Sequence, residues 1–535
     1  MFVEWNTIQL LAPEIVLVIA ASAMFVAGAF TRNRSWWAMA SLVSYLAAGA
    51  VLAGQNWPAD APSVVSGPAL IDPLALGIRW LALLMGIVFT LATSRLADEE
   101  LASEYFGCIM LVATGVMVTA VANDLVLLFL GLELLSVPTY VLLFLGRRDR
   151  ASGEATMKYF FLSILSSALL LYGFCLLFGL GKTTIIAGTS AIPGIREALS
   201  SPQALRGMPL APLAPLALIL IMSGLGFRLA IAPLQFYAPD VYQGTTSANA
   251  GLLAVAPKIA GVVGLTRLAI IAMPATAEFA WQLALILSLI TMTIGNVCAL
   301  WQRNVRRLLA YSSIAHGGYL LIGLAAGAAA AGATEGSYRG GISSMLLYVM
   351  VYSLATMGAF AALAYLGSWR RDVNEIDELS GLASSQPLTA AAMAVFMFSL
   401  AGLPPLAGFW GKLNLFSAAI ELATGSAGGT SRWFSLLCVV AALNAAIAAA
   451  YYLRVVAVMY FQAPASSPPP AMGGNGARLA TLVLAGLVVL VGAWPGRAFE
   501  VATEAENVLR PQLRTVQAPP ARPVAPLLVG SQAGP

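Results

Sequence analysis

The chain has 535 residues, of which 59% are hydrophobic and only 10% are charged, and its formal net charge at pH 7 is +4. Soluble domains carry about 25% charged residues, so this composition indicates a protein that crosses a membrane many times. So small a net charge also excludes a basic surface for nucleic acid.

Apolar runs of about 20 residues, the length that crosses a bilayer as a helix, recur along the chain. The first run has a polar start and no small-residue cleavage site, so we expect it to be a mature helix and not a signal peptide. In chain order the sequence predicts an all-α protein with about fourteen transmembrane helices, at residues 10–30, 36–54, 71–94, 105–122, 124–145, 156–180, 214–237, 248–271, 281–300, 308–332, 342–367, 389–422, 432–461 and 479–496.

Positive charge is unevenly distributed between the connections of these helices. Connections after odd-numbered helices contain twelve arginines, whereas those after even-numbered helices contain six lysines and arginines in total. Because cytoplasmic loops carry the excess of positive charge, we expect both termini on the non-cytoplasmic side.

Several ionisable side chains fall inside the predicted helices, where each charge costs roughly 2.5–3.5 kcal/mol and therefore needs a partner, a wet cavity or a function. A single one, such as Lys158, is often a structural ion pair or a side chain that reaches the membrane surface. A lone histidine is often only a hydrogen-bonded helix contact. Several in neighbouring helices favour a proton relay, because burial disfavours a charged lysine and a nearby carboxylate favours it. The candidates for such a relay are Glu133, Lys158, Lys258, His316 and Lys412, together with the cation Arg228.

Prolines interrupt two of the predicted helices close to these cations. Pro233 follows Arg228 on the seventh helix, and Pro404–Pro405 precedes Lys412 on the twelfth. Proline removes a backbone donor, and broken helices at membrane depth commonly line ion sites, although a plain kink is the alternative. The offset of five helices, which Glu133 and His316 repeat, suggests a duplicated five-helix unit whose two copies are inverted.

Motifs that hold cofactors are missing from the sequence. The cysteines stand singly in apolar runs without a CxxC pair, which excludes zinc, iron–sulfur and disulfide frameworks. Neither GxGxxG nor a GxxxxGK motif followed by serine or threonine occurs, so we expect no cofactor or metal on this chain. The cysteines are Cys108, Cys175, Cys298 and Cys438.

Several segments resemble subunit N of respiratory complex I, the proton-translocating NADH:quinone oxidoreductase, in order from about residue 10 to about residue 460. The PDVYQG string separates this resemblance from subunits L and M and from Mrp antiporters. The matching segments are LLAPEIVLV, NDLVLLFLGLELLSVPTYVL, EATMKYFFLSILSSALLLYG, FRLAIAPLQFYAPDVYQGTTSANAGLLAVAPKIAG, NVRRLLAYSSIAHGGYLLIG and LAGLPPLAGFWGKLNLF.

The resemblance implies an antiporter-like organisation. Residues 1–104 would hold helices 1–3, residues 105–271 the first repeat of helices 4–8, and residues 272–461 the second repeat of helices 9–13. Residues 462–497 would form a loop and helix 14. The Pro/Ala-rich tail, residues 498–535, is expected to be disordered.

The resemblance also implies roles for the buried charges as a proton path along the membrane midplane. Glu133 matches the helix-5 carboxylate, Lys258 the central helix-8 lysine and Lys412 the helix-12 group near the outlet. Lys158 matches a further family lysine. His316 is expected in the same path.

Two positions depart from the family pattern. Arg228 replaces the usual helix-7 lysine, and Gln235 replaces a usual histidine. Arginine does not release its proton in proteins. Arg228 is therefore either a fixed counter-charge for Glu133, the interpretation we favour, or a sign that the channel of this subunit is silent and only connects its neighbours.

The resemblance implies a bacterial inner-membrane location, lipid contact and neighbours similar to subunits K, M and L. NADH, flavin, iron–sulfur clusters and quinone would be bound by other subunits, and this chain would relay protons coupled to quinone reduction. Two alternatives remain open: an antiporter-like subunit of a related hydrogenase or cation/proton antiporter complex, and a non-pumping structural spacer of the membrane arm.

Overall fold

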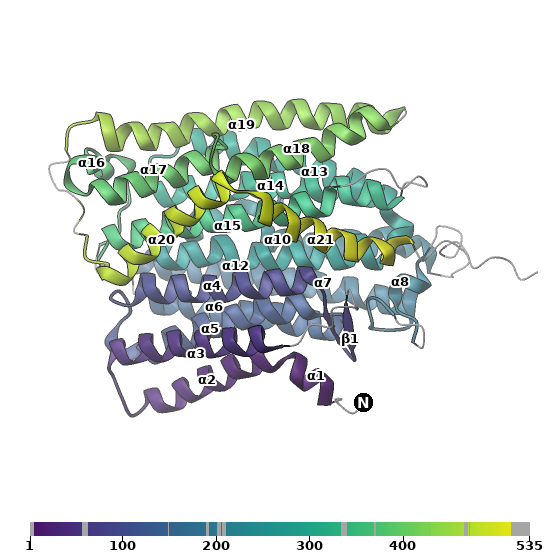
Figure 1. The fold of residues 1–535 in the computed structure, drawn as a ribbon, viewed down its shortest axis with the longest axis horizontal. Helices are drawn as coiled ribbons and strands as arrows, with labels where there is room; N and C mark the ends of the chain where they lie inside the picture. Colours follow the sequence, from purple (N-terminus) through teal and green to yellow (C-terminus); the bar gives the residue numbers. More distant parts are fainter. Residues whose placement is uncertain are drawn as a thin grey trace, which may run out of the picture.

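The computed structural model describes residues 5–55, 63–147, 149–188, 192–200, 205, 210–332, 340–368, 371–426, 428–464, 469 and 471–514. The long helices run side by side in one bundle, with α2 along one edge and α19 along the opposite edge (Figure 1). Helix α1 and the end of α21 lie at the same end of the bundle, as an even number of membrane crossings requires.

The helices of the first half of the described chain are α1 (Trp5–Leu10), α2 (Ala12–Gly28), α3 (Arg34–Gly54), α4 (Pro73–Thr93), α5 (Ala102–Val121), α6 (Leu125–Gly146), α7 (Arg150–Gly181), α8 (Ile195–Ala198), α10 (Ala214–Leu229), α11 (Tyr237–Gly244) and α12 (Ser247–Leu265). Those of the second half are α13 (Ala277–Leu300), α14 (Val305–Gly332), α15 (Gly341–Leu366), α16 (Leu382–Ser385), α17 (Pro387–Ala401), α18 (Ala407–Gly425), α19 (Gly429–Phe461), α20 (Gly474–Ala493) and α21 (Gly496–Arg514).

The predicted all-α membrane fold is confirmed. Among the described residues, 12 helical segments are long and apolar enough to cross a membrane, and the shorter apolar helices α2 and α17 are two more candidates. Acidic side chains in short loops set where several helices begin, because a carboxylate there accepts the free N–H groups of the first turn. Asp124, for example, accepts from Val126 and Leu127 and separates α6 from α5.

Both predicted broken helices are present. The seventh pass consists of α10 and α11, and α10 is followed by Ala230, whose φ of 56° is left-handed. The twelfth pass consists of α17 and α18, and α17 is followed by Gly402 with φ of 90°. Since a helix end leaves its last carbonyl groups without intrahelical partners, each break exposes polar backbone inside the bundle.

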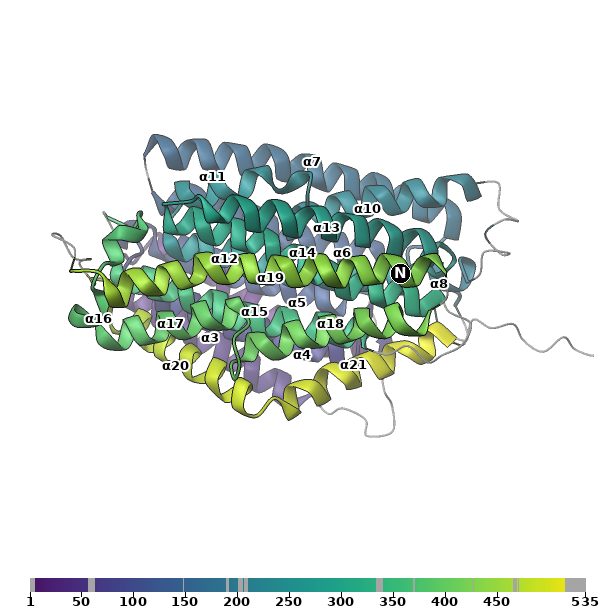
Figure 2. The same cartoon turned by 90° about the horizontal axis from the view of Figure 1, so that it is seen from above.

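The core of the bundle is formed by α12, α14 and α15. Every residue of α12 is buried, as are nearly all those of α15. Helix α14 contacts both α11 and α18 and so lies between the two broken passes. In Figure 2, α7 lies along one edge and α20 and α21 along the opposite edge. The ionisable residues of the central helices are therefore screened from lipid by their neighbours.

Two structured segments were not predicted. Residues Val64–Ser66 and Ala69–Ile71 form a two-stranded antiparallel hairpin, β1 and β2, in which Val64 pairs with Ile71. The prediction of a disordered tail is wrong for residues 498–514, which belong to α21. The buried residues Ala502, Ala505 and Leu509 follow helical spacing there. Residues 515–535 of the tail lie outside the described residues.

Candidate functional site

Glu133 and Arg228 form a polar cluster between α6, α7 and α10. One guanidinium nitrogen of Arg228 donates to Ser136 Oγ at 2.6 Å, and another lies 3.4 Å from Glu133 Oε1. Ser167 Oγ donates to the same carboxylate oxygen at 2.5 Å. The side chain of Arg228 is 2% exposed and that of Glu133 is 27% exposed. The predicted contact between the two residues is thus present, with Ser136 as the closer partner of the arginine.

Lys258 lies on the fully buried helix α12 and is only 1% exposed. Its ammonium group donates to the carbonyl oxygen of Leu229 at 2.7 Å, at the break between α10 and α11. The negative end of a helix favours a cation, so this break forms the counterpart of the charged lysine. At Gly317 on α14, a Cβ atom would lie 2.6 Å from that carbonyl oxygen and 3.5 Å from Lys258 Nζ. Only glycine therefore lets α14 approach this closely.

His316 lies on α14, is 3% exposed, and has both ring nitrogens in hydrogen bonds. Nδ1 is 2.6 Å from the hydroxyl of Tyr348 on α15, and Nε2 is 3.0 Å from the hydroxyl of Tyr452 on α19. Tyr452 also hydrogen-bonds Ser312, one turn before His316. The imidazole is thus surrounded by hydroxyl groups, each of which is able to donate and to accept a hydrogen bond.

Lys412 on α18 repeats the arrangement of Lys258 at the second helix break. Its ammonium donates to the carbonyl oxygens of Leu400 at 2.9 Å and Ala401 at 2.8 Å, which are the last carbonyls of α17. The ammonium also lies 5.1 Å from the ring centre of Tyr319, within cation–π range. Gly402 terminates α17 in a left-handed backbone conformation, which glycine adopts without the strain that a Cβ would add.

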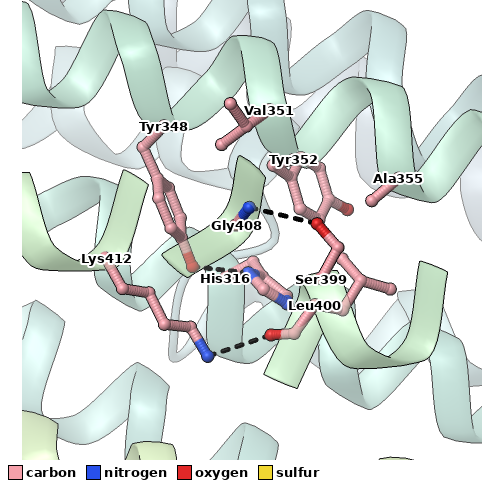
Figure 3. Close-up of a pocket in the computed structure, with 9 residues that line it drawn as sticks. All are labelled: His316, Tyr348, Val351, Tyr352, Ala355, Ser399, Leu400, Gly408 and Lys412. Carbon is pink, nitrogen blue, oxygen red and sulfur yellow. Dashed lines mark hydrogen bonds between the residues drawn. The ribbon is translucent and has the colours of Figure 1, made fainter. Parts of the chain in front are cut away.

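A small cavity of about 10 Å³ lies at this break, next to His316 and Lys412. That volume is room for about one water molecule. Figure 3 shows Tyr348, Tyr352 and Ser399 around it, with dashed lines for the bonds from Lys412 to the Leu400 carbonyl, between His316 and Tyr348, and from Gly408 to Ser399. The histidine of α14 and the lysine of α18 therefore line one cavity.

Lys158 and Gln235, also singled out in the sequence, take no part in these hydrogen bonds. The side chain of Lys158 is 40% exposed and pairs with Glu154 at 2.7 Å and with Asp240 at 2.8 Å. Arg307 joins the same carboxylate at 2.8 Å. Gln235 lies in the break after α10, and its Oε1 has no hydrogen-bond partner in the described part of the chain. The structure does not bring Lys158 to the buried lysines.

The structure instead gathers five of the predicted residues inside the bundle, which we call the buried polar line: Glu133, Arg228, Lys258, His316 and Lys412. Arg228 contacts Glu133, and the carbonyl of the following residue, Leu229, accepts from Lys258. Glutamate, lysine and histidine side chains exist in protonated and deprotonated forms, whereas arginine stays charged. The line therefore combines titratable side chains with one permanent cation.

Sequence reasoning missed the hydroxyl groups that surround His316 in the buried polar line. Tyr348 and Tyr352 are four residues apart on α15, and Ser312 and His316 are four apart on α14, so each pair occupies one helix face. Hydroxyl side chains at this spacing inside apolar runs were the available signal. Which helix they would face could not be read from the sequence.

Buried ion pairs outside this line were also missed, among them Glu14–Arg79 and Asp72–Arg267. Glu14 and Arg79 make two hydrogen bonds of 2.7 Å each, and neither side chain is more than 3% exposed. Asp72 and Arg267 approach to 3.1 Å, and Arg267 also donates to a backbone carbonyl. Each charge has a dedicated partner, so these pairs fasten helices together. Within the described ranges, no group of three or more His, Cys, Asp or Glu side chains is placed to hold a metal ion.

Comparison with known proteins gives one consistent match. The family described as NADH:quinone oxidoreductase/Mrp antiporter, TM matches residues 122–432. The NADH-quinone oxidoreductase subunit N of Trichlorobacter lovleyi is 35% identical over 459 residues, which cover 85% of this chain and 88% of the relative.

Solved structures agree with this match. A chain of respiratory complex I from Thermus thermophilus with bound aureothin has 29% identity and a TM-score of 0.73, covering 92% of this chain and 99% of its own. A chain of the Mrp complex from a Dietzia species has a TM-score of 0.77 at 18% identity, covering 95% and 99%. At that identity the second similarity concerns the fold alone.

Proposed function

The chain belongs to the NADH:quinone oxidoreductase/Mrp antiporter family of transmembrane subunits, as a subunit N of proton-translocating complex I, and we propose that protons cross it along the buried polar line. It is thus an antiporter-like subunit of a translocase. In this proposal the chain contributes no redox centre. Quinone reduction in other subunits changes the charge at one end of the line, and protons move in response.

One observation carries the proposal: each of the two helix breaks directs free carbonyl oxygens at a buried lysine. Lys258 meets Leu229 at the first break, and Lys412 meets Leu400 and Ala401 at the second. A carbonyl stabilises the ammonium form without the permanent charge of a carboxylate. Both lysines are therefore suited to bind a proton and to release it.

The remaining members of the line have distinct proposed roles. Arg228 is a fixed positive charge beside Glu133. The distance between the two determines how strongly the Glu133 carboxylate attracts a proton from the neighbouring titratable group of the line. His316 is the proposed group between Lys258 and Lys412, and it lines the small cavity that Lys412 also lines. Lys158, with Asp240 and Arg307, is proposed as the uptake group at the end of the bundle where these charges gather.

The surroundings of the chain are proposed from the same family membership. Apolar side chains are exposed along α7 and α19, which fits contact with lipid and with neighbours similar to subunits K, M and L. NADH, flavin, iron–sulfur clusters and quinone would be held by other subunits. We further propose a bacterial inner membrane with both termini on the non-cytoplasmic side, in line with the arginine-rich connections after odd-numbered helices. The antiporter-like repeats are proposed at 105–271 and 272–461.

Replacing Lys412 by methionine tests the proposal at the outlet end of the line. We expect proton translocation per NADH oxidised to fall, because the last proton-exchanging group is lost while Lys258 still loads. The assembled complex should persist, since methionine fills similar space without a buried charge. The measurement is NADH-driven acidification of inverted membrane vesicles, normalised to assembled complex.

The matched control is Lys182→Met, which makes the same exchange at an exposed lysine after α7. If Lys412→Met translocates as many protons per NADH as Lys182→Met does, Lys412 does not carry protons. The spacer alternative predicts that equality, and the relay predicts a clear difference.

A further inference from the structure

Tyr352 on α15 lies between Lys258 and His316, two members of the buried polar line. Its hydroxyl lies 2.9 Å from Ser313 Oγ and 3.2 Å from the carbonyl oxygen of Ala254. Ser313 is three residues before His316 on α14, and Ala254 is four residues before Lys258 on α12. The tyrosine is therefore fastened to both helices, one turn from each proton-exchanging residue.

The ring of Tyr352 contacts both of these residues. Its centre is 5.9 Å from Lys258 Nζ and 4.9 Å from the centre of the His316 ring. The described hydrogen bonds of Lys258 and His316 go elsewhere, to Leu229 and to the hydroxyls of two other tyrosines. No described hydrogen bond joins the lysine to the histidine, and an aromatic ring lies beside both.

From this geometry we propose that Tyr352 is a gate that closes the connection between Lys258 and His316. The inference rests on the proposed function, because a gate has meaning only if protons use this line. A charged Lys258 attracts the face of the ring, and this attraction ends when the lysine becomes neutral. The small cavity that Tyr352 lines with His316 and Lys412 has room for about one water molecule beside the ring.

The gate differs from a relay in what its removal should do. A relay residue supplies a proton site, so its loss slows transfer. A gate prevents transfer at the wrong moment, so its loss permits protons to pass without NADH oxidation. The hydroxyl of Tyr352 bonds neither Lys258 nor His316 in the described contacts, which favours the gate.

The experiment measures passive proton leak into proteoliposomes that contain the purified complex. A potassium gradient with valinomycin imposes a membrane potential without NADH, and a trapped pH dye follows internal acidification. We expect Tyr352→Ala to raise the leak severalfold. Tyr352→Phe, which keeps the ring but loses the anchors on Ser313 and Ala254, should raise it less.

A double variant distinguishes a specific leak from a damaged protein. Adding Lys258→Met to Tyr352→Ala should return the leak to the wild-type rate, because protons need Lys258 to reach the opened gate. The matched control is Tyr365→Ala, which removes a tyrosine from the same helix whose hydroxyl is 3.3 Å from Gln386. If Tyr352→Ala does not assemble, Tyr352→Leu replaces it.

Two results would overturn the gate. One is a wild-type leak in the assembled Tyr352→Ala complex, and the other is a raised leak that persists after Lys258→Met is added. Failure of the proposed function has a different signature, namely undiminished NADH-driven translocation in the single variant Lys258→Met. The two ideas are therefore refuted by separate measurements.

Discussion

Replacing Lys258 by methionine is expected to abolish NADH-driven proton translocation through this subunit while the complex stays assembled. Lys258 is the one member of the buried polar line on the fully buried helix α12. Methionine is of similar length and has no charge to desolvate. The exchange leaves the carbonyl of Leu229 without its lysine donor, at a cost of about 1–3 kcal/mol, which a large helical bundle tolerates.

The measurement is the number of protons translocated per NADH oxidised by the purified complex in proteoliposomes. NADH oxidation is expected to slow as well, because coupled electron transfer waits for protons to move. Lys182→Met provides the control for the chemistry of the exchange. An assembled Lys258→Met complex that translocates as many protons as this control would remove Lys258 from the path.

Replacing Arg228 by alanine is expected to give the second largest effect, on both assembly and coupling. Breaking a fully buried ion pair costs roughly 3–5 kcal/mol. Glu133 keeps 27% of its side chain exposed and retains Ser167, so we expect the smaller loss of about 1–3 kcal/mol typical of an unsatisfied polar group. Without the positive charge of Arg228 beside it, the Glu133 carboxylate should also lose its fixed counter-charge, and coupling to the rest of the line should weaken.

Arg228→Lys should keep assembly and activity, because lysine supplies the positive charge that the fixed counter-charge interpretation requires. The amount of assembled complex and the midpoint of its thermal unfolding report stability, and proton translocation per NADH reports coupling. Arg432→Ala, at an exposed arginine of α19, controls for the loss of an arginine as such. Full activity and stability of Arg228→Ala would contradict the pairing with Glu133 and favour a silent channel.

The sequence predicts the membrane passes well because a helix needs about 20 apolar residues to cross the bilayer, and because backbone groups without hydrogen bonds are costly in lipid. Even α5 and α6, which are separated by little more than Asn123 and Asp124, are two helices, because the carboxylate of Asp124 caps the second. The breaks after α10 and α17 lie next to Pro233 and Pro404–Pro405, because proline lacks the backbone N–H that would continue a helix. These features depend on local sequence alone.

The contacts inside the bundle depend on which faces of the helices pack against one another. Uniformly apolar helices contain little sequence information about that packing. Tyr348, Tyr352 and Tyr452 come from α15 and α19 to surround His316, far away in the sequence. Lys158 looked like a member of the line but lies with Asp240 and Arg307, which only the fold brings to it.

Helix α21 was missed for a different reason. The composition of the Pro/Ala-rich tail was averaged over residues 498–535 and concealed a short amphipathic helix at its start. Glu506 on that helix accepts from the backbone N–H groups of Gly340 and Ser343 at the beginning of α15. A buried carboxylate that caps a distant helix has no local sequence signal. The inverted relation of the two five-helix repeats stays a prediction.

The most direct test of the central claim, that Lys258 takes up and releases a proton, is the number of protons translocated per NADH by the Lys258→Arg complex. Arginine keeps the positive charge and a donor for Leu229 but does not release its proton. The account predicts a lower ratio than in the wild-type complex, with assembly preserved. An unchanged ratio would mean that Lys258 acts only as a fixed charge and that protons take another route.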